Sequence, residues 1–162
     1  MACPTPEQLI NNFGATVLVV KRQTDGLSHA DSLLVPPFRG NCLNWVLGHI
    51  VKGRNEALQR LGAEPLWSQK TMDLYTSGSD HEFARANALP LEQLLSDLEE
   101  TQTRLESELK NASETLLDSE IQVGMHMTSV RARLDGLHWH ETLHAGSLEL
   151  LRQLAGKNDQ VF

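Results

Sequence analysis

The sequence predicts an all-α fold, an antiparallel four-helix bundle formed by a single domain that covers residues 1–162. Apolar residues recur at helical spacing in four long segments, and glycine- and proline-containing stretches separate these segments. The alternating pattern of β-strands is nearly absent. A chain of 162 residues with 40% hydrophobic and 22% charged residues suits one globular domain with a sizeable core.

The first two helices are indicated by their start and stop signals. Thr5-Pro6-Glu7-Gln8 offers a threonine N-cap, a proline at the first helical position and a glutamine at the third, which together make a capping box. This helix is expected to end at Asp25-Gly26. The second helix is expected to begin with Asn41 as its cap and to end at Gly62.

The second half of the chain supplies two more helices after a long connection. Residues 62–90 are expected to be irregular, and a loop of this length suggests a cover over a functional site. A leucine stripe predicts the third helix from Leu91 to Leu109. The fourth helix is expected to begin near Thr128-Ser129 and to end at Gly156.

Composition and charge exclude several classes of protein. A net charge of −7 argues against a nucleic-acid partner. No apolar run approaches the ~20 residues that span a bilayer. The N-terminal residues lack the pattern of a signal peptide, so we expect a cytoplasmic protein. Cys3 and Cys42 are too few for a disulfide framework, and Cys42 is expected to pack as a small apolar residue.

The segment His140-Glu141-Thr142-Leu143-His144 carries the clearest chemical signal. Two histidines at positions i and i+4 lie on one face of a helix and suit a divalent metal ion. The segment also matches the HExxH pattern of zinc proteases. A protease is the least favoured reading, because no histidine follows His144, Glu149 lies too close to fold back as a ligand, and an edge strand to present the substrate is missing.

Helical-wheel positions separate the candidate residues of the last helix. Relative to Leu137, the centre of the apolar stripe, His144 lies about 20° away, Glu141 about 40° and His140 about 60°. These three polar side chains interrupt the apolar stripe and therefore require partners. His138 points about 100° away and is expected to face solvent.

A third ligand has to come from another helix, and His49 is the best candidate. It lies at the edge of the second helix's apolar stripe, and Gly48 and Gly53 beside it leave room for close approach. The alternative is a core histidine with an ordinary hydrogen bond. The remaining histidines, His29, His81 and His126, lie in connections and are expected to be surface residues.

A second apolar ridge runs along the last helix, on a different side from its core stripe. Its residues are Trp139, Leu143, Leu150 and Leu154. A helix that is apolar on two sides needs two packing partners. The bundle core supplies one, and a second copy of the chain is expected to supply the other, so we expect a homodimer.

Two segments resemble the DinB-like family of metalloproteins, also called YfiT-like. Residues 44–50, Asn-Trp-Val-Leu-Gly-His-Ile, resemble its NWxxGH helix, and residues 140–146 resemble its HExxHxG last helix. The resemblance implies a four-helix bundle, a divalent metal ion held by His49, His140 and His144, and frequent homodimers. Ser147 stands where the family often has glutamine.

The resemblance gives a firmer expectation of metal binding than of any particular reaction. Members include S-transferases that join low-molecular-weight thiols to electrophiles, others called hydrolases, and many without assigned chemistry. A three-histidine site suits Zn, Ni, Fe or Co. Glu141 is expected to act as a general base or to orient an imidazole. We therefore expect a metal-dependent enzyme on small molecules, with a non-catalytic metal-binding homodimer as the alternative.

Overall fold

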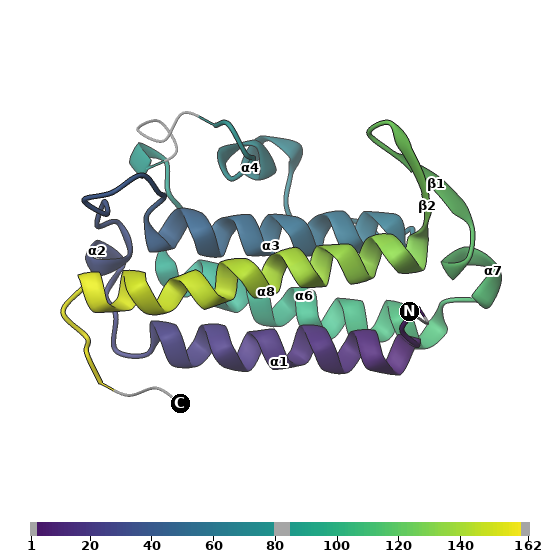
Figure 1. The fold of residues 1–162 in the computed structure, drawn as a ribbon, viewed down its shortest axis with the longest axis horizontal. Coiled ribbons are helices and arrows are strands. Elements are labelled where there is room, and N and C mark those ends of the chain that lie inside the picture. Colours follow the sequence, from purple (N-terminus) through teal and green to yellow (C-terminus); the bar gives the residue numbers. More distant parts are fainter. Residues whose placement is uncertain (1–2, 80–84, 160–162) are drawn as a thin grey trace.

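The computed structural model describes residues 3–79 and 85–159, and it confirms the predicted four-helix bundle (Figure 1). α3 packs against α6 and α8, and α1 packs against the same two helices. No helix in the described ranges is long and apolar enough to cross a membrane. The bundle helices are α1 (Pro6–Thr24), α3 (Leu43–Arg60), α6 (Leu91–Asn111) and α8 (Val130–Leu154).

The connections carry short elements that the sequence analysis did not predict. α4 (Gln69–Leu74) lies within the connection expected to be irregular, and Ser68 caps it by accepting a hydrogen bond from the Thr71 amide. An antiparallel hairpin of β1 (Glu120–Val123) and β2 (His126–Ser129) precedes α8. Strands of four residues are too short to show a clear alternation in sequence. Within the described residues, α2 (His29–Ser32) and α7 (Glu114–Leu117) are also short helices.

Most of the predicted helix boundaries agree with the structure. The Thr5 capping box is present, and Ser129 caps α8 by accepting from the Ala132 amide. The cap predicted for the second helix was wrong by one residue. Cys42, not Asn41, has the extended backbone of an N-cap, and no side chain caps this end. As predicted, Cys42 packs half-buried against the core.

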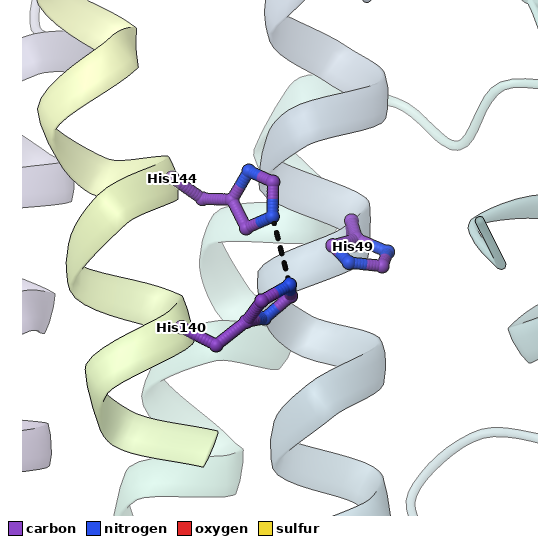
Figure 2. Close-up of side chains that lie close together, drawn as sticks. All are labelled: His49, His140 and His144. Carbon is purple, nitrogen blue, oxygen red and sulfur yellow. Dashed lines mark hydrogen bonds between the residues drawn. The ribbon is translucent and has the colours of Figure 1, made fainter. Parts of the chain in front are cut away.

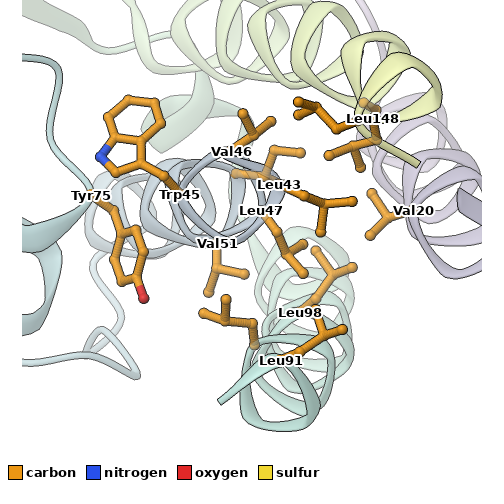
Figure 3. Close-up of a cluster of buried hydrophobic side chains, with 14 of the residues drawn as sticks. Val20, Leu43, Trp45, Val46, Leu47, Val51, Tyr75, Leu91, Leu98 and Leu148 are labelled. Atoms are coloured by element: carbon orange, nitrogen blue, oxygen red, sulfur yellow. The ribbon is translucent and has the colours of Figure 1, made fainter. Parts of the chain in front are cut away.

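The core consists of two apolar clusters, one toward each end of the bundle. The first contains Val20, Leu47, Leu98 and Leu148 (Figure 3). The second contains Phe13, Leu58, Leu105 and Leu134, among others. The early residues of α3 and α6 share one cluster and their late residues share the other, so these two helices run in the same direction. The long connection between them returns the chain to the starting end and makes this possible.

Candidate metal centre

Three histidine side chains converge between α3 and α8. His49 projects from α3, and His140 and His144 project from α8 toward it (Figure 2). One ligand nitrogen from each lies within 4.8 Å of the other two. The Nε2 atoms of His140 and His144 are 3.1 Å apart. The structure thus brings together all three residues that the sequence analysis selected as ligands, and this group could hold a metal ion.

The donor set fits a divalent transition metal. Zinc–nitrogen bonds of 2.0–2.1 Å place the nitrogens around a tetrahedral ion about 3.4 Å apart. The His140–His144 separation is already close to this value, and the outer limit of 4.8 Å needs a shift of about an ångström. His49 is buried, His144 is half-buried and His140 is exposed, so the cluster is open on one side.

All three imidazoles have pKa values below the ordinary range, which keeps them neutral and able to bind a metal. Burial lowers the pKa of His49 more than its hydrogen bond to the Tyr75 carbonyl raises it. Partial desolvation of the imidazole, followed by the positive charges of Arg133 and Lys52, lowers the pKa of His140. Burial and the two neighbouring histidines lower the pKa of His144 to about 4.

A backbone carbonyl orients His49. The Nδ1 atom of His49 lies 2.6 Å from the carbonyl oxygen of Tyr75. A carbonyl only accepts, so Nδ1 carries the proton and donates, while Nε2 is left free as the ligand. The Trp45 ring stacks on the imidazole, with ring centroids 4.8 Å apart and an interplanar angle of 10°. These two contacts fix both the tautomer and the plane of the ring.

Tyr75 is itself held in place by the first turns of α3. An ideal Cβ on Gly48 would lie 2.2 Å from the Tyr75 ring, so only glycine lets the ring approach. The Tyr75 hydroxyl donates to Asn44 Oδ1 at 3.3 Å and accepts from the Leu89 amide at 2.9 Å. Tyr75 and Trp45 lie on the opposite side of α3 from Val20 (Figure 3).

Tyr75, the partner of His49, comes from the connection of residues 62–90 that was expected to cover a functional site. Sequence analysis foresaw the room left by Gly48 but did not identify Tyr75 as its occupant. Tyr75 is the only tyrosine of the chain. Its position in a connection that was expected to cover a site was the sequence signal that could have identified Tyr75 as a site residue. Gly53 is different, because a Cβ there would meet nothing within 4 Å.

Glu141 points inward, as predicted, and is paired with a cation that the sequence analysis missed. Arg54 Nε donates to both carboxylate oxygens at 3.2 and 3.0 Å, and Arg54 Nη2 donates to Oε1 at 2.5 Å. Arg54 is fully buried and Glu141 nearly so. Within the described ranges, the hydrogen bonds of Glu141 go to Arg54 and not to an imidazole.

Arg54 connects all four helices of the bundle. From α3 it donates to the Phe13 carbonyl on α1 at 2.7 Å and to the Gln102 side chain on α6 at 3.1 Å, besides Glu141 on α8. The signal in the sequence was its spacing, since Arg54 stands four residues after Ile50 and four before Leu58 on the core stripe. A charge on each of two core stripes predicts a buried pair.

The other histidines lie away from the cluster. His138 was expected to face solvent, but it is half-buried and packs edge-on against the Phe13 ring, with centroids 5.4 Å apart. α1 packs closely on this side of α8, which a wheel for one helix does not show. His29 and His126 are exposed, as predicted. His81 lies outside the described residues.

A cavity of about 390 Å³ adjoins the cluster on the side of His49 and His140. Charged residues from both helices, Lys52, Glu56 and Arg133, line it together with Gly53 and Gly136. A second cavity of about 250 Å³ lies on the side of His144 and is bordered by residues including Phe38, Val46 and Leu150. Small molecules therefore have access to the histidines from two directions.

Comparison with known proteins identifies the fold. A conserved protein from Enterococcus faecalis superposes with a TM-score of 0.77 at 16% identity, over 95% of this chain and 98% of that chain. A mycothiol-dependent maleylpyruvate isomerase gives a TM-score of 0.67 at 13% identity, over 91% of this chain and 63% of the isomerase. The chain has the DinB-like fold.

Sequence comparison adds nothing to this assignment. No protein-family model matches the chain, and no curated protein sequence matches it. A histidine-to-alanine mutant of the isomerase gives a TM-score of 0.66 at 13% identity, with the same coverage. The solved structures thus show the fold, and the three-histidine group that this chain carries on it could hold a metal ion.

Proposed function

We propose that His49, His140 and His144 hold one divalent ion, Zn, Ni, Fe or Co, in an enzyme that acts on small molecules. The observation that carries this proposal is the convergence of three imidazoles, all with lowered pKa values, beside a cavity of about 390 Å³. A divalent ion with three neutral ligands keeps its charge and lowers the pKa of a water or thiol at an open position.

The reaction we propose is thiol S-transfer, with hydrolysis as the second possibility. The likeness to a mycothiol-dependent isomerase supports a low-molecular-weight thiol as one substrate. Two cavities that border the histidine cluster, one at His49 and His140 and the other at His144, suit a reaction between two molecules. Because the chain spans 63% of that isomerase, the isomerase's own substrate is not carried over.

The chain's own residues have defined tasks in this proposal. The Tyr75 carbonyl and the Trp45 ring hold His49 with Nε2 toward the cluster. Arg54, five residues after His49 on α3, forms a hydrogen-bonded ion pair with Glu141. Glu141 lies between the other two histidines on α8. This ion pair supports a positioning role for Glu141, in which it fixes the two ligand-bearing helices relative to each other.

A general-base role for Glu141 would require its release from Arg54, and one substitution separates the two roles. Glu141→Gln preserves the size of the side chain and removes its basicity. A general base contributes roughly 100-fold or more to turnover, so a loss of that size at full metal occupancy would establish this role. Unchanged turnover at full occupancy would leave positioning as the role of Glu141.

Turnover assays on metal-loaded protein test the enzymatic proposal. A panel of low-molecular-weight thiols with electrophiles, and of simple esters, should show metal-dependent product formation. Its complete absence would favour the alternative, a non-catalytic metal-binding protein. A zinc protease remains the least supported reading, since the described residues contain no strand other than the β1–β2 hairpin. Metal-dependent cleavage of an unfolded protein substrate would support the protease reading.

We further propose a homodimer in the cytoplasm. Trp139, Leu143 and Leu150 of the second apolar ridge are 65%, 55% and 60% exposed, which leaves a face of α8 uncovered. This ridge borders both cavities, because Trp139 lines one and Leu150 lines the other. Light scattering should give twice the mass of one chain, and Leu143→Glu should give monomers. A monomeric wild-type protein would contradict the proposal.

A further inference from the structure

We propose that Arg133 and Lys52 form an anion subsite that binds the carboxylate of a small ligand beside the three histidines. This inference rests on the proposed function, because it describes what the cavity next to the metal cluster selects. It adds a class of ligand, a small molecule that carries a carboxylate, which neither the histidines nor the fold specify.

The subsite is built from the same two helices as the cluster. Lys52 and Glu56 lie one and two turns beyond His49 on α3. Arg133 lies two turns before His140 on α8. All of them line the cavity of about 390 Å³. A ligand in this cavity therefore touches the cluster at one end and the charged residues at the other.

The charges in the cavity are unbalanced. Lys52 Nζ donates to Glu56 Oε1 at 2.6 Å. Arg133 Nη2 lies 3.7 Å from Glu56 Oε2, which is beyond hydrogen-bond distance. Two cations thus share one carboxylate. A second carboxylate, brought by a ligand, would balance them.

The guanidinium of Arg133 also has N–H groups that are not used in hydrogen bonds within the described part of the chain. Its Nε atom is buried and has no hydrogen-bond partner in the described part of the chain. Buried polar atoms in native proteins nearly always have partners, so the guanidinium, whose side chain is 29% exposed, lacks the bonds that would hold it in place and can turn toward a ligand in the cavity. The planar fork of a guanidinium matches the two oxygens of a carboxylate, which makes this anion a better fit than a compact halide.

Two glycines keep the subsite open. Gly53 on α3 and Gly136 on α8 line the cavity, and a Cβ on either would meet nothing within 4 Å. Neither glycine is required by helix packing, and both cost helix stability relative to alanine. Their absent side chains leave the cavity large enough for a small ligand, in the lower part of the range for binding pockets.

Calorimetric titration with matched charged and neutral probes tests the subsite. Metal-loaded protein is titrated with mercaptoacetate and mercaptoethanol, and separately with fumarate and fumaramide in the presence of mercaptoethanol. The first pair places the carboxylate on the thiol, and the second places it on the other reactant. Charge-assisted hydrogen bonds predict that one charged probe binds roughly 10- to 100-fold more tightly than its neutral match.

Arg133→Gln should abolish this preference without changing metal content or the helical circular dichroism spectrum. Arg104→Gln is the matched control, because Arg104 forms a surface ion pair with Glu100 on α6 and does not line the cavity. It should leave the preference intact. A preference that survives Arg133→Gln would refute the role of Arg133, and one that also survives the added Lys52→Gln would mean that the ion alone attracts the carboxylate and would refute the whole subsite.

The outcomes separate the subsite from the proposed function. A preference for mercaptoacetate assigns the carboxylate to the thiol, and a preference for fumarate assigns it to the second reactant. Equal binding of charged and neutral probes in both arms overturns the subsite. If the wild-type protein binds no metal, the proposed function fails, and the fumarate and fumaramide titrations on metal-free protein still decide whether Arg133 selects a carboxylate.

Discussion

Replacing Gly48 with alanine should damage the metal site through a residue that is not a ligand. The new Cβ would lie 2.2 Å from two atoms of the Tyr75 ring, whereas ordinary contacts begin near 3.4 Å. The ring must therefore retreat by at least about 1.2 Å. Because the Tyr75 hydroxyl is bound to Asn44 and Leu89, the ring cannot retreat without breaking these bonds or shifting its own backbone.

The expected loss follows from two opposing contributions. Overpacking of a core typically lowers the free energy of unfolding by about 1–3 kcal/mol. Alanine in place of glycine in a helix raises it by up to about 1 kcal/mol. We expect a net decrease of about 1–2 kcal/mol in the free energy of unfolding. Loss of the Tyr75 carbonyl as the partner of His49 Nδ1 should also weaken metal binding on the order of 10–100-fold.

Urea unfolding followed by tryptophan fluorescence and metal competition with a chelator measure the two effects. Gly53→Ala is the matched control, since it lies on the same helix and its Cβ would meet nothing within 4 Å. This variant should be more stable than the wild type by about 0.5–1 kcal/mol. If Gly48→Ala matched Gly53→Ala in stability and bound metal normally, the argument that Gly48 positions His49 through Tyr75 would be refuted.

Two further predictions concern the buried charges. Arg54→Met leaves Glu141 charged and unpaired in the core, so the free energy of unfolding should fall by about 3–5 kcal/mol in urea titrations, and adding Glu141→Leu should recover most of it. In metal-free protein, the lowered pKa of His144, about 4 against an ordinary 6.5, means that the folded state binds fewer protons than the unfolded state between these pH values. Stability should therefore fall as the pH drops through this window, by roughly 2–3 kcal/mol from His144, and His144→Gln should flatten the profile.

The sequence predicted the bundle because its helices carry strong, local signals. The capping box at Thr5 and the leucine stripe of α6 need no knowledge of tertiary contacts. The same holds for His140 and His144, whose spacing within one helix places them side by side. His49 required a further argument, from its place on another helix and from a family resemblance.

What the sequence did not predict depends on contacts between distant segments. Tyr75 fits over Gly48 only once the 62–90 connection has folded back on α3. Arg54 and Glu141 stand 87 positions apart, so each stands out as a charge on its own core stripe, but their pairing becomes visible only when α3 packs against α8. His138 was placed in solvent because a helical wheel takes no account of α1, where Phe13 covers it. Short elements such as α4 and the hairpin have too few residues to show a clear periodic pattern in the sequence.

Metal content tests the central claim most directly. Purified protein, loaded with a divalent ion and freed of excess, should hold about one ion per chain by elemental analysis. His49→Ala, His140→Ala and His144→Ala should each abolish tight binding, while His138→Ala, two residues from His140 on the same helix, should retain the ion. An intact ion in His49→Ala, at wild-type affinity, would contradict the three-histidine centre.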